Sequence, residues 1–275
     1  MPEELAARAE AVEAEFMYQY ESSAPPSIAA ALGITTTRIG GGVALSMRHD
    51  PTGYWSKALG FGFDEPVTAG LVDRVLDFYR SEGSVGAVLQ IAPSVLPADW
   101  ADIARRHGLR PGGRIVKLAC PIEDFTPAGE TALRIEHVGP GDARAWASVV
   151  LKGFGMPEEG LAEMLVAVAG HPNWRPFAAW EGDRIVGGAS LFLHGEVASL
   201  NSGAVLADHR NRGAQSALIA ARVREAASAG CRWLVAETGE PAEGVGNPSL
   251  NNMLRAGLQR LYTRQSWIWS PGGIS

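Results

Sequence analysis

The chain has 275 residues, of which 46% are hydrophobic and 20% charged, and its formal net charge is 24 − 30 = −6. This apolar fraction excludes a wholly disordered chain, and the acidic balance argues against a surface that binds nucleic acid throughout. Two cysteines, Cys120 and Cys231, fit neither a disulfide framework nor a CxxC metal clip. Of the 24 basic residues, 21 are arginine, which suits phosphate recognition better than lysine does.

Targeting signals and several common site motifs are missing from the sequence. Residues 1–15 are rich in Glu and Ala and resemble a helix rather than a signal peptide, and the longest apolar stretches, such as 185–193, are about half of a membrane span. We therefore expect a soluble, cytoplasmic protein without a membrane partner. GxxxxGK[ST], HExxH, GxSxG and a strand-linked GxGxxG do not occur, and the six histidines lack metal-ligand spacing, so we expect no metal.

Periodicity and turn residues predict the elements in chain order. In the first half they predict helices at 1–15, 71–80 and 100–106 and strands at 85–89 and 115–118. In the second half they predict strands at 133–135, 177–180, 185–193, 197–206 and 233–236, with a closing strand toward Trp269. Helices are expected at 142–150, 158–168, 217–227 and 251–255. This order predicts a mixed α/β (α+β) fold.

The composition of residues 121–130 indicates a linker, because prolines and acidic residues cluster there between two strand-like runs. We place a domain boundary near residue 128, giving domains 1–127 and 128–275. The halves echo each other: in each, a helix ending at glycine leads to a strand, two prolines, a short helix, Gly-Leu and a closing strand. Duplication explains this echo, although strand–helix alternation is common enough for a chance match.

The stretch 205–218 carries the clearest chemical signal. A strand enters a loop containing Arg210, Arg212 and Gly213, and a long helix begins immediately. Amide groups in the first turn of such a helix lack acceptors and lie at the positive end of its dipole, so the loop is suited to a diphosphate. From 210 to 232 there are five Arg and one Glu, a local charge of +4. The alternative is an ordinary solvated helix start.

The segment Arg210-Asn211-Arg212-Gly213-Ala214-Gln215 resembles the acyl-CoA-binding motif of the GNAT superfamily of N-acetyltransferases, Gln/Arg-x-x-Gly-x-Gly/Ala. Val205 also matches, whereas Ala207 takes a position that is usually Pro and Gln215 one that is usually Gly or Ala. The resemblance covers about residues 131–269. It implies two GNAT-like domains, each with a mixed, largely antiparallel sheet flanked by helices.

The resemblance also implies an acetyl-CoA site. The backbone of Val205, Leu206 and Ala207 would pair with the pantetheine arm like an added strand. The diphosphate would be held by the Arg210 side chain and by the amides of the segment that follows, which contains Arg212, Gly213, Ala214, Gln215 and Ser216. Asn252 aligns best with an Asn that contacts the cofactor in the family. Turn and N-cap chemistry is the alternative for the asparagines here, and Asn247 fits it very well.

The general acid and base are less clear from the sequence. Acyl transfer to an amine needs a base for the amine and an acid for the leaving thiolate. Many family members use a Tyr on the last helix as the acid, where this chain has Met253. We name Tyr262, on the closing strand, as the substitute acid, with a core or rim aromatic as the alternative. Glu237, after 233–236, is the candidate base, with a salt bridge or helix cap as the alternative.

The corresponding loop of the first half, 59–68, has lost its arginines and carries Asp64 and Glu65 near the helix entrance, where they would repel a diphosphate. We therefore expect a degenerate first domain, whose Trp55, Phe61 and Phe63 either wall a shared cleft or fill its core.

The function expected is an acetyl-CoA-dependent N-acetyltransferase acting on the amine of a small molecule by direct attack through a tetrahedral intermediate, without a nucleic-acid partner. The alternatives are a non-catalytic acyl-CoA-binding or sensing protein, or a structural module that binds no CoA. The sequence does not decide between a monomer and a homodimer.

Overall fold

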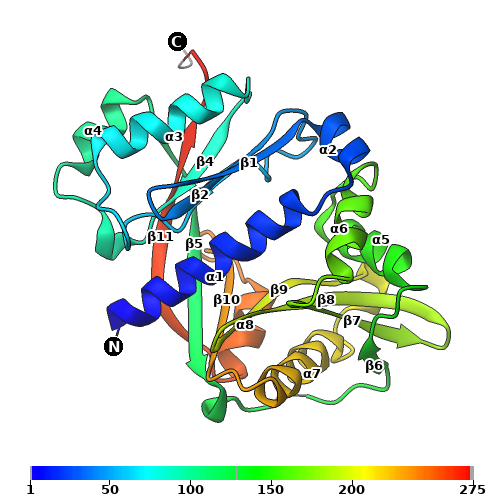
Figure 1. Cartoon of the computed structure of the whole chain (residues 1–275). Coiled ribbons are helices and arrows are strands. Elements are labelled where there is room, and N and C mark those ends of the chain that lie inside the picture. Colours follow the sequence, from blue (N-terminus) through cyan, green and yellow to red (C-terminus); the bar gives the residue numbers. More distant parts are fainter. Residues whose placement is uncertain (1, 128, 273–275) are drawn as a thin grey trace. The chain divides into compact units, whose positions relative to one another are not determined.

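A computed structural model of the chain describes residues 2–127 and 129–272 (Figure 1). The chain forms two compact units: unit 1 comprises residues 1–116 and 261–275, and unit 2 comprises residues 117–260. Ala128, where we expected the domain boundary, lies outside the described residues.

Unit 1 begins with helices and continues into a small sheet. Its helices are α1 (Pro2–Ser22), α2 (Pro26–Leu32), α3 (Ala69–Ser81) and α4 (Trp100–Arg106), with a short 3₁₀ turn at Pro93–Val95. Its strands are β1 (Ile34–Ile39), β2 (Gly42–Met47), β3 (Lys57–Leu59) and β4 (Ala87–Gln90), together with parts of β5 (Arg110–Pro121) and β11 (Gln259–Trp269).

The strand order in unit 1 is β1-β2-β3-β4-β11-β5. The pairs β1–β2, β2–β3 and β4–β11 are antiparallel, and β3–β4 is parallel. The apolar face of α3 packs on this sheet with Leu76 and Tyr79 fully buried, and Trp269 of β11 stacks on Tyr79 with ring centroids 5.9 Å apart. The last strand of the chain therefore completes the core of the N-terminal unit, as the red ribbon beside β4 shows in Figure 1.

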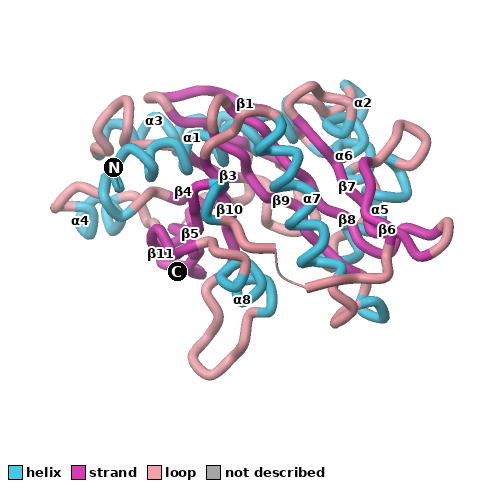
Figure 2. Tube along the Cα trace, turned by 90° about the horizontal axis from the view of Figure 1, so that it is seen from below, coloured by secondary structure: helices cyan, strands magenta, loops and turns pink. Residues whose placement is uncertain are grey.

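Unit 2 repeats this arrangement. Its helices are α5 (Ala143–Phe154), α6 (Leu161–Ala169), α7 (Ala214–Ser228) and α8 (Pro248–Arg255), with 3₁₀ turns at Ile122–Asp124 and Ala207–His209. Its strands are β6 (Arg134–His137), β7 (Trp174–Glu181), β8 (Arg184–His194), β9 (Val197–Val205) and β10 (Trp233–Gly239), and the end of β5 lies beside β10. Helix α7 lies across β7, β8 and β9 (Figure 2).

The two halves of the chain have the same order of elements from α1 to β5 and from α5 to β11: two helices, three strands, a helix, a strand, a short helix and a closing strand. The echo expected from the sequence is thus present in the fold. Each unit takes its last strand from the other half, because β4 pairs with β11 and β10 neighbours β5. The compact units therefore do not meet at a single boundary near residue 128. Composition along the chain carries no information about strands that pair with the other half.

Within the described parts of the chain, no helix is both long and apolar enough to cross a membrane.

Candidate functional site

Strands β9 and β10 part from each other in the middle of unit 2. Their parallel pairing joins Val197–Leu200 to Trp233–Ala236 and ends there, although β9 runs on to Val205 and β10 to Gly239. Asn201 and Glu237 are the next residues on the two strands. The parting strands leave backbone edges that a third, extended group with amides can pair with.

Helix α7 begins directly after β9 and the short turn at Ala207–His209. Its N-cap is Gly213, whose φ of 76° is left-handed. The position has no room for a side chain, because a Cβ there would lie 2.1 Å from the carbonyl oxygen of Glu130. Gly213 caps the helix without a side-chain hydrogen bond. The first-turn amides of Ala214, Gln215 and Ser216 therefore keep the donor character and positive potential that attract an anion.

The arginines of this loop are arranged differently from the sequence expectation. Arg212 donates to Glu181 Oε1 at 2.6 Å, and His209 Nε2 lies 3.0 Å from the other oxygen of the same carboxylate. These two hydrogen bonds lower the pKa of Glu181, and the bond from Arg212 has the larger effect. Arg210 is exposed and donates from Nε to the Val205 carbonyl at 3.3 Å. The sequence offered no signal for Glu181, which lies on β7, far from the motif along the chain.

The local charge of +4 is also reduced in the fold. Arg212 is paired with Glu181, Arg232 lies 3.7 Å from Glu196, and Arg222 is buried beneath the sheet. Backbone amides and Arg210 are therefore the groups of the loop that remain best placed for an anion, because the other charges are neutralised or enclosed.

The side chains of Gln215 and Asn252 meet, although 37 positions separate them in the sequence. Asn252 Nδ2 donates to Gln215 Oε1 at 2.5 Å, and Gln215 Nε2 donates to Ser249 Oγ at 3.1 Å. The start of α7 is thus tied to α8, where we had aligned Asn252 with the cofactor-contacting Asn. Asn247 caps α8 by accepting from the Leu250 amide at 3.1 Å, which confirms the N-cap interpretation of this residue.

The backbone of the end of β9 is partly engaged. Leu206 N–H donates to the Val186 carbonyl of β8 at 2.9 Å, and the Val205 carbonyl accepts from Arg210. Ala207 is exposed at the start of the 3₁₀ turn.

Glu237 lies where β9 and β10 part, near the position expected from the sequence. Its Oε2 accepts from Lys117 Nζ at 2.9 Å, and Lys117 itself is almost fully buried. The salt-bridge alternative for Glu237 is thus realised in the structure. A carboxylate at this position can orient a cationic group.

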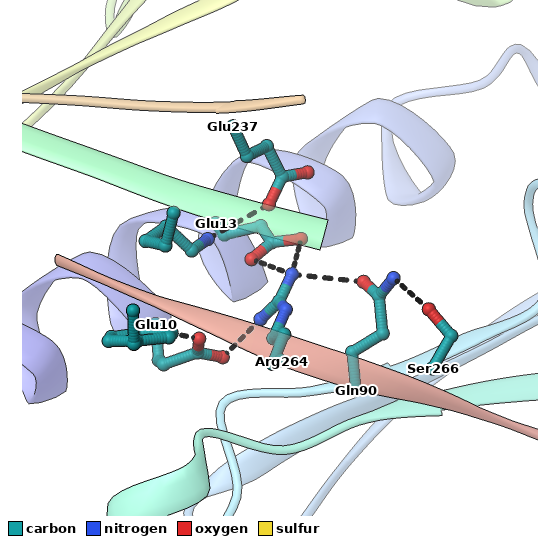
Figure 3. Close-up of polar contacts among 8 residues, drawn as sticks. Glu10, Glu13, Gln90, Glu237, Arg264 and Ser266 are labelled. Atoms are coloured by element: carbon teal, nitrogen blue, oxygen red, sulfur yellow. Dashed lines mark hydrogen bonds and ion pairs between the residues drawn. The ribbon is translucent and has the colours of Figure 1, made fainter. Parts of the chain in front are cut away.

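Tyr262 belongs to unit 1, where its hydroxyl donates to Glu10 Oε1 of α1. Burial, followed by the charge of Glu10, raises the pKa of Tyr262 far above its ordinary value. Glu10 also accepts from Arg264, which bonds Glu13 and Gln90 in the same network (Figure 3). Tyr262 is therefore a protonated phenol held by a buried polar cluster.

The equivalent helix start in unit 1 is closed. Thr68 caps α3 by accepting from the Leu71 amide at 3.2 Å, and Glu65 forms an ion pair with Arg74. Phe61 and Trp55 are buried, in agreement with the core interpretation, and Phe63 is half-buried. A first turn capped by its own chain, with carboxylates nearby, is unsuited to a diphosphate.

Comparison with known proteins finds a family match within unit 2. Residues 151–245 match the sequence model of the acetyltransferase (GNAT) family. Among curated proteins, none matches the sequence.

Several solved structures share the fold. A GCN5-related N-acetyltransferase from Kribbella flavida is 15% identical, covers 98% of this chain and 96% of its own, and gives a TM-score of 0.65. A GCN5-related N-acetyltransferase from Sphaerobacter thermophilus is 17% identical, and the match covers 86% of this chain and 75% of that protein, with a TM-score of 0.62. A tandem GNAT protein from the clavulanic acid biosynthesis pathway is 13% identical, and the match covers 98% of this chain and 96% of that protein, with a TM-score of 0.60.

The fold class and the resemblance inferred from the sequence are thereby confirmed. The chain has the mixed α/β fold of GCN5-related N-acetyltransferases, including a tandem one, and its residues 151–245 match the GNAT family model. Acyl transfer is the general activity that this match supports.

Proposed function

We propose that the chain is an acetyl-CoA-dependent N-acetyltransferase that acetylates the amine of a small molecule. The observation that carries the proposal is the start of α7, whose first turn has no side-chain cap and directly follows the strand that parts from β10. The two features together suit the two ends of an acyl-CoA: a diphosphate at the helix start and an amide-bearing arm along the strand.

In the proposed site, the amides from Arg212 to Ser216 and the Arg210 side chain hold the diphosphate, and the Gln215–Asn252 contact shapes its edge. The pantetheine arm lies along Val205, Leu206 and Ala207. The amine lone pair attacks the thioester carbonyl carbon, and the carbonyl electron pair moves to oxygen. When the carbonyl re-forms, the C–S bond breaks, and the thiolate takes up a proton equivalent to the one that the amine has lost.

Glu237 remains the proposed base and Tyr262 the proposed acid. Glu237 has the better support, because it is the first β10 residue beyond the pairing with β9. The raised pKa of Tyr262 keeps its proton on the phenol at neutral pH, but the same shift makes it a weaker donor. The acidic net charge of the chain favours a cationic amine as acceptor over a nucleic acid.

The second candidate function is a non-catalytic acyl-CoA-binding or sensing protein. Met253, buried on α8, stands where many family members have a tyrosine acid, and the hydroxyl of Tyr262 is bonded to Glu10. Both observations favour binding without turnover.

Acetyl-CoA titration and an amine panel test the proposal. We expect the wild-type chain to bind acetyl-CoA and to release thiol with at least one cationic amine. Ser216→Asp should weaken binding by about tenfold or more, because it places a carboxylate against the diphosphate while leaving the helix dipole well satisfied. Ser228→Asp, at the far end of the same helix, is the matched control and should bind as the wild type does.

Binding without thiol release from any amine would favour the second candidate. Equal affinity in the Ser216→Asp and Ser228→Asp variants would contradict the assignment of the diphosphate to α7.

A further inference from the structure

The segment that leads into β6 passes close to the start of α7. The carbonyl oxygen of Glu130 occupies the space that a side chain on Gly213 would need. Thr131 follows and donates from Oγ1 to the Arg212 carbonyl at 2.7 Å, across 81 positions of sequence. Both contacts lie within unit 2. The end of the linker expected from the sequence therefore packs on the loop in which we place the diphosphate.

The hydroxyl of Thr131 is held in place by the backbone on its own side. Its oxygen accepts from the Leu133 N–H at 3.2 Å, while its proton is donated to the Arg212 carbonyl. A threonine side chain that closes a turn in this way has a fixed direction relative to the residues that follow, here the strand β6. The hydrogen bond therefore ties the loop to the edge of the sheet and not to a free segment of chain.

The loop that receives this hydrogen bond has an unusual backbone. Asn211 has a φ of 60° and Gly213 a φ of 76°, so left-handed residues stand on both sides of Arg212. Such conformations persist where the surrounding contacts hold them. Arg212 is held twice: its carbonyl accepts from Thr131, and its guanidinium donates to Glu181 of β7 at 2.6 Å. The two contacts fix the residue between the two left-handed positions.

The hydrogen bond from Thr131 also determines where the next amide points. No peptide bond in the described residues is cis, so the carbonyl and the N–H of the Arg212–Gly213 peptide point in opposite directions. Because the carbonyl faces Thr131, the Gly213 N–H faces away from it. This N–H is one of the amides that we assign to the diphosphate, and such a site depends on amides that keep a common direction. Without the hydroxyl, the peptide is freer to rotate away from that direction.

We propose that Thr131 is a positioning residue of the diphosphate site: together with Glu181 it holds Arg212, so that the Gly213 N–H is presented to the diphosphate. The inference rests on the proposed function. It assigns the side chain of Arg212 to the anchoring of the loop and leaves the binding of the diphosphate to the backbone amides and Arg210. Thr131 itself touches neither the ligand nor the reacting atoms.

Acetyl-CoA and S-acetyl-pantetheine test this role, because both carry the thioester arm and only acetyl-CoA carries the diphosphate. The quantity measured is the dissociation constant of S-acetyl-pantetheine divided by that of acetyl-CoA, and we expect a wild-type ratio well above one. Thr131→Val should reduce the ratio by roughly threefold to tenfold, the effect of one hydrogen bond, and should leave the affinity for S-acetyl-pantetheine within about twofold. Thr131→Ser keeps the hydroxyl and should retain the wild-type ratio.

Thr126→Val is the matched control, because it removes an exposed hydroxyl from the same connection between β5 and β6, and it should change neither dissociation constant. A wild-type ratio in Thr131→Val overturns the inference, and so does an equal fall of the ratio in Thr126→Val or in Thr131→Ser. Equal weakening of both ligands overturns it as well, since the defect then lies outside the diphosphate end. Thr131→Ala is judged by the same outcomes if the valine variant does not fold. A wild type that binds neither ligand contradicts the proposed function itself.

Discussion

Glu21, near the end of α1, is a buried carboxyl group. It is 1% exposed, and neither of its oxygens has a hydrogen-bond partner in the described structure. Burial, reinforced by the nearby charge of Asp50, raises the pKa of Glu21 well above its ordinary value. The folded chain therefore keeps the proton that the unfolded chain releases above about pH 4.3.

This difference predicts how stability depends on pH. Because the folded pKa is raised, the contribution of Glu21 is fully present below the unfolded pKa and is lost as pH rises, at up to about 1.4 kcal/mol per pH unit, until the folded pKa is passed. Glu21→Gln removes this loss. We expect the variant to gain stability over the wild type at pH 7 and little or none at pH 4, as measured by urea denaturation. An equal gain at both pH values would contradict the assignment.

Arg264 is a second buried charged residue of unit 1. It is fully buried and bonds Glu10 and Glu13 of α1 (Figure 3). Arg264→Met leaves these carboxylates without the guanidinium, so we expect a loss of about 3–5 kcal/mol in the free energy of unfolding. Adding Glu10→Gln and Glu13→Gln should recover part of it.

The exposed pair Arg38–Glu15, at 2.7 Å, provides the comparison. Arg38→Met is expected to cost less than about 1 kcal/mol, since surface ion pairs contribute little. Similar losses in Arg38→Met and Arg264→Met would show that the buried network contributes no more than a surface pair.

At the scale of elements, the closing strand β11 determines whether unit 1 is complete. Trp269 is 3% exposed in the core formed by α3 and β4, although it lies near the end of the chain. We expect Trp269→Ala to cost about 3–5 kcal/mol, and hydrogen exchange should show that protection is lost in α3 and β4. Ile268→Ala, at the exposed neighbouring position, should have a small effect. Loss of protection confined to unit 2 would contradict the strand exchange.

The helices and strands themselves were largely predictable. The short helix 100–106 is predicted and observed with the same bounds, and the second half contains the predicted elements within a few residues. Alternation and helical periodicity are local signals, so they survive without knowledge of the fold. Strands β1, β2 and β3 were not predicted: β2 is buried throughout and β3 has only three residues, so neither shows the alternation of a half-buried strand.

At the scale of the whole molecule, duplication has left two helix starts that differ in chemistry. Thr68 caps α3, whereas α7 begins at Gly213 without a side-chain cap. We therefore expect one acetyl-CoA per chain by calorimetric titration. Thr68→Asp keeps a good cap and should leave the stoichiometry and affinity unchanged, while Ser216→Asp should reduce the affinity of that single site. A stoichiometry of two would contradict the degeneracy of the first copy.

The sequence by itself indicated the duplicated α/β architecture, the segment for which we propose phosphate binding and the Asn247 cap, because these depend on residues close together in the chain. Only the tertiary structure decided which charges remain available and which strand completes each sheet. Glu181 neutralises Arg212, Glu237 pairs with Lys117, and Arg222 bonds to the Asn201 carbonyl of β9. Such pairings join residues on different elements, and their energies depend on burial and distance, which a linear pattern does not contain.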